Sequence, residues 1–152
     1  MPTVTRTFTV EPAPATVIDY LKDFSHAEEW DPGTESCTRQ DAGPVQVGST
    51  FHNVSKIAGV TTELTYRLEE LTPSLVKFRG ENDSAETTDT ITVTPSGTGS
   101  EIHYEAVIEA KGTAGKLAEP VMKLLFERIG TKTEKQMTEV LNRLTPGPAS
   151  PA

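Results

Sequence analysis

Hydrophobic and polar residues alternate along the first part of the chain. Within residues 3–10, Val4, Phe8 and Val10 lie on one side and threonines lie on the other. A period of two is typical of a half-buried β-strand, because successive side chains of a strand point to opposite faces. A proline-containing run then ends the strand, and Pro14 favours the first turn of a helix, where its missing N–H removes no hydrogen bond.

Two short helices are predicted after this strand. The first has a narrow apolar stripe over residues 17–21. Ser25 is placed to cap the second helix, and Glu28, three residues later, would complete a capping box. The second helix is expected to end at Trp30, because the Asp-Pro-Gly run that follows stops helical structure.

Residues 34–111 predict about six strands, separated by turns rich in glycine, proline, asparagine and serine. The expected strands lie near residues 35–41, 47–57, 60–71, 74–80, 86–94 and 100–111. Alternation is clearest in two of them, whose apolar faces carry Leu64, Tyr66 and Leu68 in one strand and Ile102, Tyr104, Ala106 and Ile108 in the other. One apolar and one polar face indicate an antiparallel sheet that is covered on one side.

The last segment, residues 114–144, changes to helical spacing. Its second half has one narrow stripe, formed by Met137, Val140, Leu141 and Leu144, which is typical of ordinary core. Its first half has a wider stripe, formed by Leu117, Val121, Met122, Leu124, Leu125, Phe126 and Ile129. A wide stripe indicates burial on several sides, or apolar side chains that line a space. We interpret Gly130, which costs a helix about 1 kcal/mol relative to Ala, as permitting close backbone packing.

The size of the chain fits one domain. We expect this domain to cover residues 1–144 and a disordered, proline-rich tail to cover residues 145–152. With 14 basic and 22 acidic residues, the net charge is −8, which disfavours binding to nucleic acid and to anionic membrane surfaces. No stretch approaches the roughly 20 apolar residues of a membrane span, and no signal-peptide core is present. These features favour a soluble cytoplasmic protein without stable membrane insertion.

Motifs for a metal, a cofactor or a catalytic nucleophile are absent. The histidines, His26, His52 and His103, are scattered, whereas zinc sites usually show local ligand spacing. The single cysteine, Cys37, can form neither an internal disulfide nor a thiolate metal site by itself, and we interpret it as a strand residue. The sequence also lacks a nucleophile elbow, a P-loop and a dinucleotide fingerprint. We therefore expect no cofactor and no metal.

The order of these elements resembles the START-like superfamily, in its polyketide cyclase/dehydrase and lipid-transport branch, over roughly residues 3–144. The motifs that carry the resemblance are Val10-Glu11-Pro12-Ala13-Pro14, Trp30-Asp31-Pro32, Gly48-Ser49-Thr50-Phe51, and Leu71-Thr72-Pro73 before Lys77-Phe78-Arg79. The resemblance implies an α+β helix-grip fold, in which a curved seven-stranded antiparallel sheet wraps around a long C-terminal helix and two short helices follow the first strand. It also implies a cavity for lipids, sterols, polyketides or plant hormones, with catalysis in only some members.

The candidate ligand-binding residues come from the apolar faces of the strands and the wide helix stripe. They are Trp30, Phe51, Asn53, Leu64, Tyr66, Tyr104, Val121, Leu125, Phe126 and Ile129. The pocket is expected under the wide-striped half of the helix, facing the two tyrosines. Asn53 would orient a ligand if it shared the face of Phe51, whereas Asp89, another polar strand residue, receives no role.

Three functions stay open. The first is binding or transport of a hydrophobic small molecule, without catalysis. The second is a polyketide cyclase or dehydratase, for which the resemblance makes Arg67 a candidate. Arg67 must face outward if its neighbours Tyr66 and Leu68 face inward, so we favour binding. The third is a regulatory protein-interaction module, which would need a contiguous apolar patch on its surface.

Overall fold

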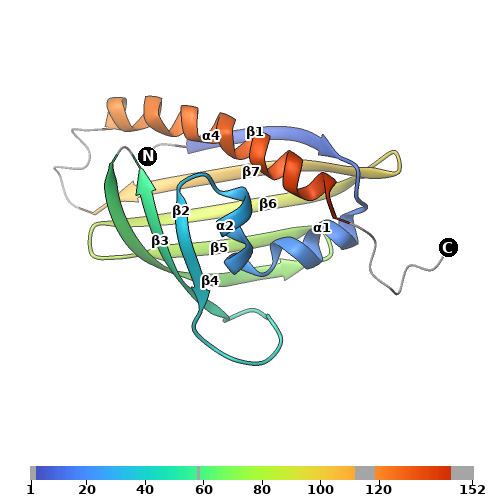
Figure 1. The fold of residues 1–152 in the computed structure, drawn as a ribbon, viewed down its shortest axis with the longest axis horizontal. Coiled ribbons are helices and arrows are strands. Elements are labelled where there is room, and N and C mark those ends of the chain that lie inside the picture. The colour runs from blue at the N-terminus through green and yellow to red at the C-terminus, as the bar shows by residue number, and fades with distance from the viewer. Residues whose placement is uncertain (1–2, 58, 112–118, 145–152) are drawn as a thin grey trace.

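The computed structural model describes residues 3–57, 59–111 and 119–144, without the side chains of residues 57 and 119–123. The elements follow in the order β1 (Thr3–Val10), α1 (Pro14–Leu21), η1 (Phe24–His26), α2 (Ala27–Trp30), β2 (Thr34–Arg39), β3 (Thr50–Ile57), β4 (Val60–Thr72), β5 (Leu75–Glu81), β6 (Ala85–Ser96), β7 (Gly99–Ala110) and α4 (Glu119–Asn142). Figure 1 shows them along the chain. The predicted tail, residues 145–152, and residues 114–118 of the predicted helix lie outside the described residues.

Seven described strands form one antiparallel sheet in the order β1-β7-β6-β5-β4-β3-β2. The first strand lies at one edge, and the six later strands follow one another as antiparallel neighbours to the other edge. The antiparallel sheet is as predicted. The strand predicted from residue 47 begins only at Thr50. Gly48 has a φ of 99°, and Ser49 donates its N–H to the carbonyl of Gln46, so a turn occupies these positions.

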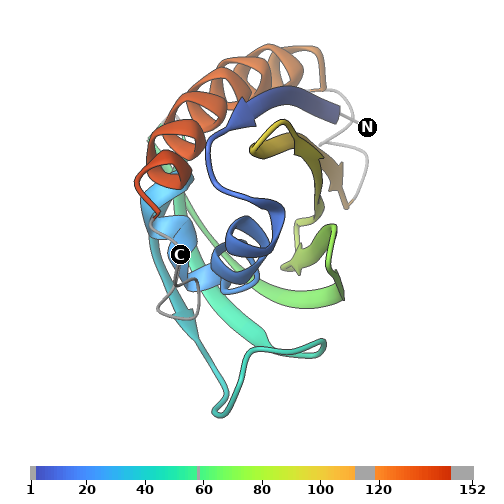
Figure 2. The same ribbon diagram turned by 90° about the vertical axis from the view of Figure 1, so that its right-hand side faces the viewer.

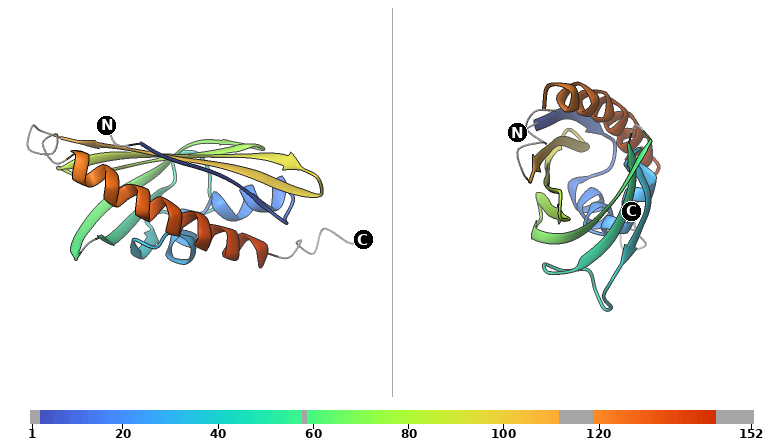
Figure 3. Two further views of the ribbon diagram at one scale, coloured as in Figure 1. Left: turned by 90° about the horizontal axis from the view of Figure 1, so that it is seen from above. Right: turned by 90° about the vertical axis from the view of Figure 1, so that its left-hand side faces the viewer.

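The sheet curls around the interior, and α4 closes the gap between its two edge strands, as the end-on view shows (Figure 2). The helix packs against β1 and against α2. Arg6 of β1 donates from Nη2 to the Glu127 carbonyl at 2.7 Å and to Thr131 Oγ1 at 3.1 Å, which ties the edge strand to the helix. Figure 3 shows α4 and the short helices on the same face of the sheet. The predicted helix-grip arrangement is confirmed.

At Gly130 the backbone of α4 lies close to β1. A Cβ atom at Gly130 would lie 2.4 Å from Cγ1 of Val4, closer than packed carbon atoms approach one another. The interpretation of Gly130 as a close-packing residue is therefore confirmed.

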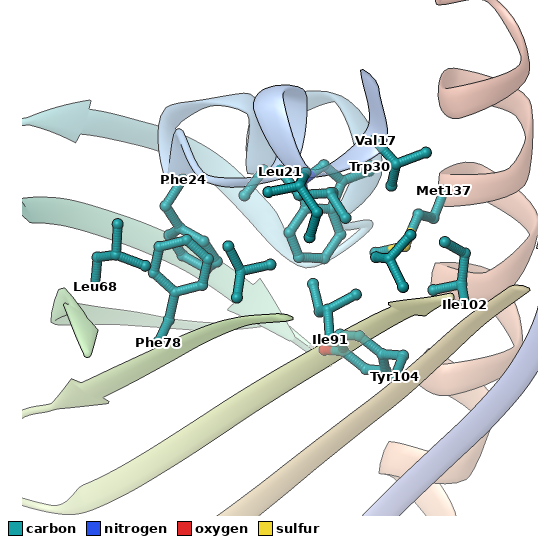
Figure 4. Close-up of a cluster of buried hydrophobic side chains, with 14 of the residues drawn as sticks. Val17, Leu21, Phe24, Trp30, Leu68, Phe78, Ile91, Ile102, Tyr104 and Met137 are labelled. Atoms are coloured by element: carbon teal, nitrogen blue, oxygen red, sulfur yellow. The ribbon is translucent and has the colours of Figure 1, made fainter. Parts of the chain in front are cut away.

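The core occupies the half of the sheet that the three short helices cover, and Figure 4 shows it. Its largest fully buried side chains are Trp30, Phe24, Phe51, Phe78, Leu21, Leu68, Ile91, Ile102, Met137, Leu141, Val17 and Val76. Aromatic rings pack edge to face there, as between Phe24 and Trp30, whose centroids lie 5.9 Å apart. The narrow-striped half of α4 supplies Met137 and Leu141, which are fully buried as expected.

The predicted capping box of the second short helix is wrong. Asp23, two residues before the predicted cap, caps η1, because its carboxylate accepts from the backbone N–H of Ser25 at 3.1 Å. Glu28 instead accepts at Oε2 from the backbone N–H of Cys37 at 2.8 Å. Ser25 lies inside the 3₁₀ turn η1 and does not cap α2, which has no side-chain cap.

Within the described residues, no helix combines the length and hydropathy needed to cross a membrane. The large hydrophobic side chains exposed there are Val47, Val60 and Leu124, which belong to the β2–β3 loop, β4 and α4. They come from three separate segments of the chain.

Candidate ligand-binding cavity

A cavity of about 430 Å³ lies between the concave face of the sheet and the first half of α4. Its walls come from β1, β3, β4, β6, β7, α4 and the turn after α2. The apolar lining residues are Val4, Val60, Leu64, Ala85, Ala106, Ile108, Leu125, Phe126, Ile129 and Gly130. The polar ones are Asp31, Ser55, Thr62, Tyr66, Thr87, Asp89, Tyr104 and Thr133, and Gly33 completes the wall.

Small residues at matching positions of neighbouring strands help to create this space. Tyr66, Gly80 and Thr87 form one row across β4, β5 and β6. Gly80 has no side chain, so the ring of Tyr66 lies over it, and a Cβ atom there would meet the ring at 2.7 Å. The ring thereby brings the Tyr66 hydroxyl to Thr87, whose Oγ1 donates to it at 3.2 Å. In the next row, Ala106 lies beside Asp89 and leaves space above the carboxyl group.

Asp89 places a carboxyl group in the wall of the cavity. It lies on β6 in phase with the buried residues Thr87, Ile91 and Val93, and it is 7% exposed. Among the described residues its one hydrogen bond is accepted at Oδ2 from the hydroxyl of Tyr104, at 3.4 Å. Burial raises its pKa to about 7, the nearby Asp31 carboxyl adds to this, and the Tyr104 hydrogen bond opposes it.

Asp31 brings a second carboxyl group to the cavity from the end of α2. Its Oδ1 accepts from the backbone N–H of Gly33 at 3.0 Å, and its Oδ2 accepts from Thr34 Oγ1 at 2.9 Å. It therefore fixes the turn after α2 as well as lining the cavity. Burial raises its pKa, and these two hydrogen bonds oppose that effect.

Two tyrosine hydroxyls complete the polar part of the wall. Burial raises the pKa of both Tyr66 and Tyr104 well above the ordinary value, so both stay protonated, and Asp89 is the next cause in each case. The Tyr104 proton is donated to Asp89. The Tyr66 hydroxyl accepts from Thr87, and its own proton has no acceptor among the described residues. The wall therefore presents a free hydroxyl donor and a carboxyl acceptor to a ligand.

Six of the ten candidate residues line the cavity, namely Leu64, Tyr66, Tyr104, Leu125, Phe126 and Ile129. Trp30 and Phe51 are fully buried in the core beside it and are not among its lining residues. Alternation does place Phe51 on the inner face, but at the half of the sheet that η1 covers, where its ring lies 6.2 Å from that of Phe24. The side chain of Val121 lies outside the described residues.

Asn53 points inward, as expected from its phase with Phe51, but its amide group faces protein atoms. Its Nδ2 donates to Thr34 Oγ1 at 3.0 Å, and its Oδ1 accepts from Ser55 Oγ at 2.5 Å. Asn53 is therefore a buried connector between β2 and β3 outside the cavity lining. Its neighbour in this network, Ser55, lines the cavity instead.

Arg67 faces outward, as the alternation predicted. Its side chain is 60% exposed, and its Nε lies 3.6 Å from Glu69 Oε2. The pairing of β4 with β5 is irregular between Leu68 and Glu70, which lies beyond Arg67, so the irregularity does not turn the arginine inward.

Asp89 lines the cavity, although no role was predicted for it from the sequence. Its signal in the sequence is the alternation Thr87, Asp89, Ile91, Val93, which puts it on the inner face with two β-branched core residues. Asp31 could not have been found in this way, because it follows a helix and its position depends on how α2 meets the sheet. Among the described residues, no three histidine, cysteine, aspartate or glutamate side chains are placed to hold a metal ion.

The family model described as polyketide cyclase / dehydrase and lipid transport matches residues 1–145. A comparison with curated proteins found no match.

Solved structures show a similar fold at low sequence identity. The Zhui aromatase/cyclase from a Streptomyces species has a TM-score of 0.78 at 16% identity, with 99% of this chain and 98% of that chain covered. A START superfamily protein from Mycobacterium smegmatis has a TM-score of 0.75 at 14% identity, covering 94% and 99%. A STAR-related lipid transfer protein from Xanthomonas axonopodis has a TM-score of 0.72 at 13% identity, covering 91% and 85%.

Proposed function

Because this chain belongs to the polyketide cyclase/dehydrase and lipid transport family, we propose that it binds or transports a hydrophobic small molecule in the cavity under α4. The observation that carries this proposal is the cavity of about 430 Å³ with its largely aliphatic wall. Ligand pockets in proteins span about 300–1,000 Å³ and combine an apolar lining with a few polar groups. A lipid or a polyketide-like molecule matches this description.

The wall explains why such a ligand would bind in the cavity. Leu64, Ile108, Leu125, Phe126 and Ile129 offer apolar contact from both the sheet and the helix. Each Å² of apolar ligand surface removed from water contributes about 25 cal/mol of favourable free energy to binding. The polar groups of Tyr66 and Asp89 would fix the orientation of the bound molecule.

Native mass spectrometry of the freshly purified protein tests this function, together with thermal unfolding in the presence of apolar ligands. We expect a co-purifying small molecule, or a rise in Tm with an added ligand. A ligand at a hundred times its Kd would stabilise the folded state by about 2.7 kcal/mol. If no small molecule co-purifies and no apolar ligand raises Tm, the proposal is wrong.

A polyketide cyclase or dehydratase is the second candidate, and Asp89 is the observation that favours it. Such an enzyme needs an inward-pointing acid–base group, and Asp89 is a buried carboxyl on the cavity wall whose pKa is raised to about 7. A general acid or base works best with a pKa near the working pH. Conversion of a poly-β-ketone substrate by the protein, lost in Asp89→Asn, would establish it. Equal product distributions with and without the protein would exclude it for that substrate.

A further inference from the structure

The charged groups of the cavity wall have one sign. Asp31 and Asp89 are the charged side chains among the described lining residues, and both are carboxyl groups. Asp89 is more than nine-tenths buried, and its Oδ1 accepts no hydrogen bond from the described residues. Asp89 lines the cavity, so an acceptor there without a protein donor favours a ligand that donates a hydrogen bond.

We propose that the ligand of this cavity is an amine, with an apolar body against α4 and the strands and a protonated nitrogen at Asp89. This inference rests on the proposed function and names the chemical class of the bound molecule. An ammonium group carries several N–H donors and no acceptor, so it can donate to Asp89 Oδ1.

The two carboxyl groups favour a cation over a neutral hydroxyl. The Asp31 charge disfavours ionisation of Asp89, since it is among the causes that raise the pKa of Asp89. An ammonium group between the strands and the turn after α2 would relieve this repulsion, whereas an alcohol would only fill the hydrogen bond. A carboxylate ligand would meet two groups of its own charge. The net charge of −8 on the whole chain also attracts cations from a distance.

The groups that face Asp89 set how such binding depends on pH. They are Tyr104 on β7, Tyr66 on β4 and Asp31 after α2, while β5 places the uncharged Phe78 beside it. Both tyrosines stay protonated at neutral pH, because burial raises the pKa of each. Asp89, whose pKa is raised to about 7, is therefore the group expected to lose a proton when a cation binds near neutral pH.

Calorimetric titration with octylamine, octanol and octanoate tests the proposal, because the three probes share one apolar chain and differ in the head group. We expect octylamine to bind most tightly and octanoate most weakly. Octylamine binding should release protons at pH 7, which is measured by repeating the titration in two buffers of different ionisation enthalpy. This second measurement needs no variant, so it holds even if a substitution affects folding.

Asp89→Asn keeps the size of the side chain and removes its charge. We expect it to weaken octylamine binding by about thirtyfold or more, as loss of a buried charge partner does, and to weaken octanol binding far less, because an alcohol carries no charge. Asp83→Asn removes the same charge from an exposed position in the β5–β6 turn and serves as the matched control, which should keep the wild-type preference.

The outcomes separate this proposal from the one on which it rests. If octanol or octanoate binds at least as tightly as octylamine, the cavity binds apolar molecules but the amine proposal is wrong. The amine proposal is also wrong if octylamine binds without proton release, or if Asp89→Asn keeps the preference for octylamine. If none of the three probes binds and no apolar ligand raises Tm, the binding function itself fails.

Discussion

The charge of Asp89 has opposite effects on folding and on the proposed binding. It destabilises the folded protein, whereas it would stabilise a bound cation. Its carboxyl group lies on an inner face otherwise occupied by Ile91 and Val93, where ionisation is disfavoured. A folded-state pKa of about 7, against an ordinary value of 3.8, means that the folded state holds a proton that the unfolded chain has lost. Stability therefore falls as pH rises from about 4 to 7, because over this range the folded state binds more protons than the unfolded state.

Replacing Asp89 by Asn should therefore stabilise the protein at high pH. Relative to wild type, the gain in the free energy of unfolding should be larger at pH 8 than at pH 4, by up to about 4 kcal/mol. Urea denaturation at the two pH values measures it. Asp83→Asn, at an exposed position, should show no such difference. An Asp89→Asn protein with the pH dependence of the wild type would contradict the assignment.

Cys37 offers a second prediction at the residue scale. It is 3% exposed, and burial raises the pKa of its thiol to about 12 from an ordinary value of 9. Because only the thiolate reacts readily, the folded protein should react with a disulfide reagent at pH 8 far more slowly than the protein in concentrated urea. Absorbance of the released thiol follows both reactions. Equal rates would show that Cys37 is accessible in the folded state.

At the scale of elements, the contact between α4 and β1 decides how the sheet is closed. Arg6 reaches two residues of the helix, and Gly130 lets the backbone of the helix approach Val4. The same helix face then continues into the cavity with Phe126 and Ile129. The contact between β1 and α4 therefore also sets the position of one cavity wall.

The variant Gly130→Ala tests the close contact between α4 and β1. Alanine normally stabilises a helix by about 1 kcal/mol relative to glycine. Here its methyl group would lie 2.4 Å from Cγ1 of Val4, a stiff β-branched side chain, so we expect net destabilisation by about 1–3 kcal/mol. Chemical denaturation measures it, and Lys135→Ala, at an exposed position of the same helix, should cause little change. Stabilisation by Gly130→Ala would mean that the helix lies farther from β1.

At the scale of the whole molecule, the sheet has two halves with different roles. Under α1, η1 and α2 it carries a filled core (Figure 4). Under the first half of α4 it encloses the cavity. The filled half supplies packing that the hollow half lacks. A ligand-binding cavity can exist because the rest of the interior already stabilises the fold.

Filling the hollow half should remove binding and preserve the fold. Ala106→Phe places a ring in the cavity from β7, so ligand-induced stabilisation should disappear while Tm without ligand stays near or above that of the wild type. Glu105→Phe puts the same ring on the opposite face of β7 and should leave binding intact. Thermal unfolding with and without octylamine compares the variants. Unchanged ligand stabilisation of Ala106→Phe would place the binding site elsewhere.

The sequence by itself determined the helices and strands, their order along the chain and the inner face of the strands with clear alternation, because side-chain periodicity depends only on local backbone geometry. It thereby placed Leu64, Tyr66 and Tyr104 inside and Arg67 outside, and the width of its apolar stripe marked the hollow half of the last helix. Tertiary structure decided the rest. Whether an inner residue meets core or cavity depends on which helix covers it, so Phe51 and Trp30 became core. Asp31 and Asp89 line the same cavity although they lie far apart in the chain, and no local pattern could bring them together.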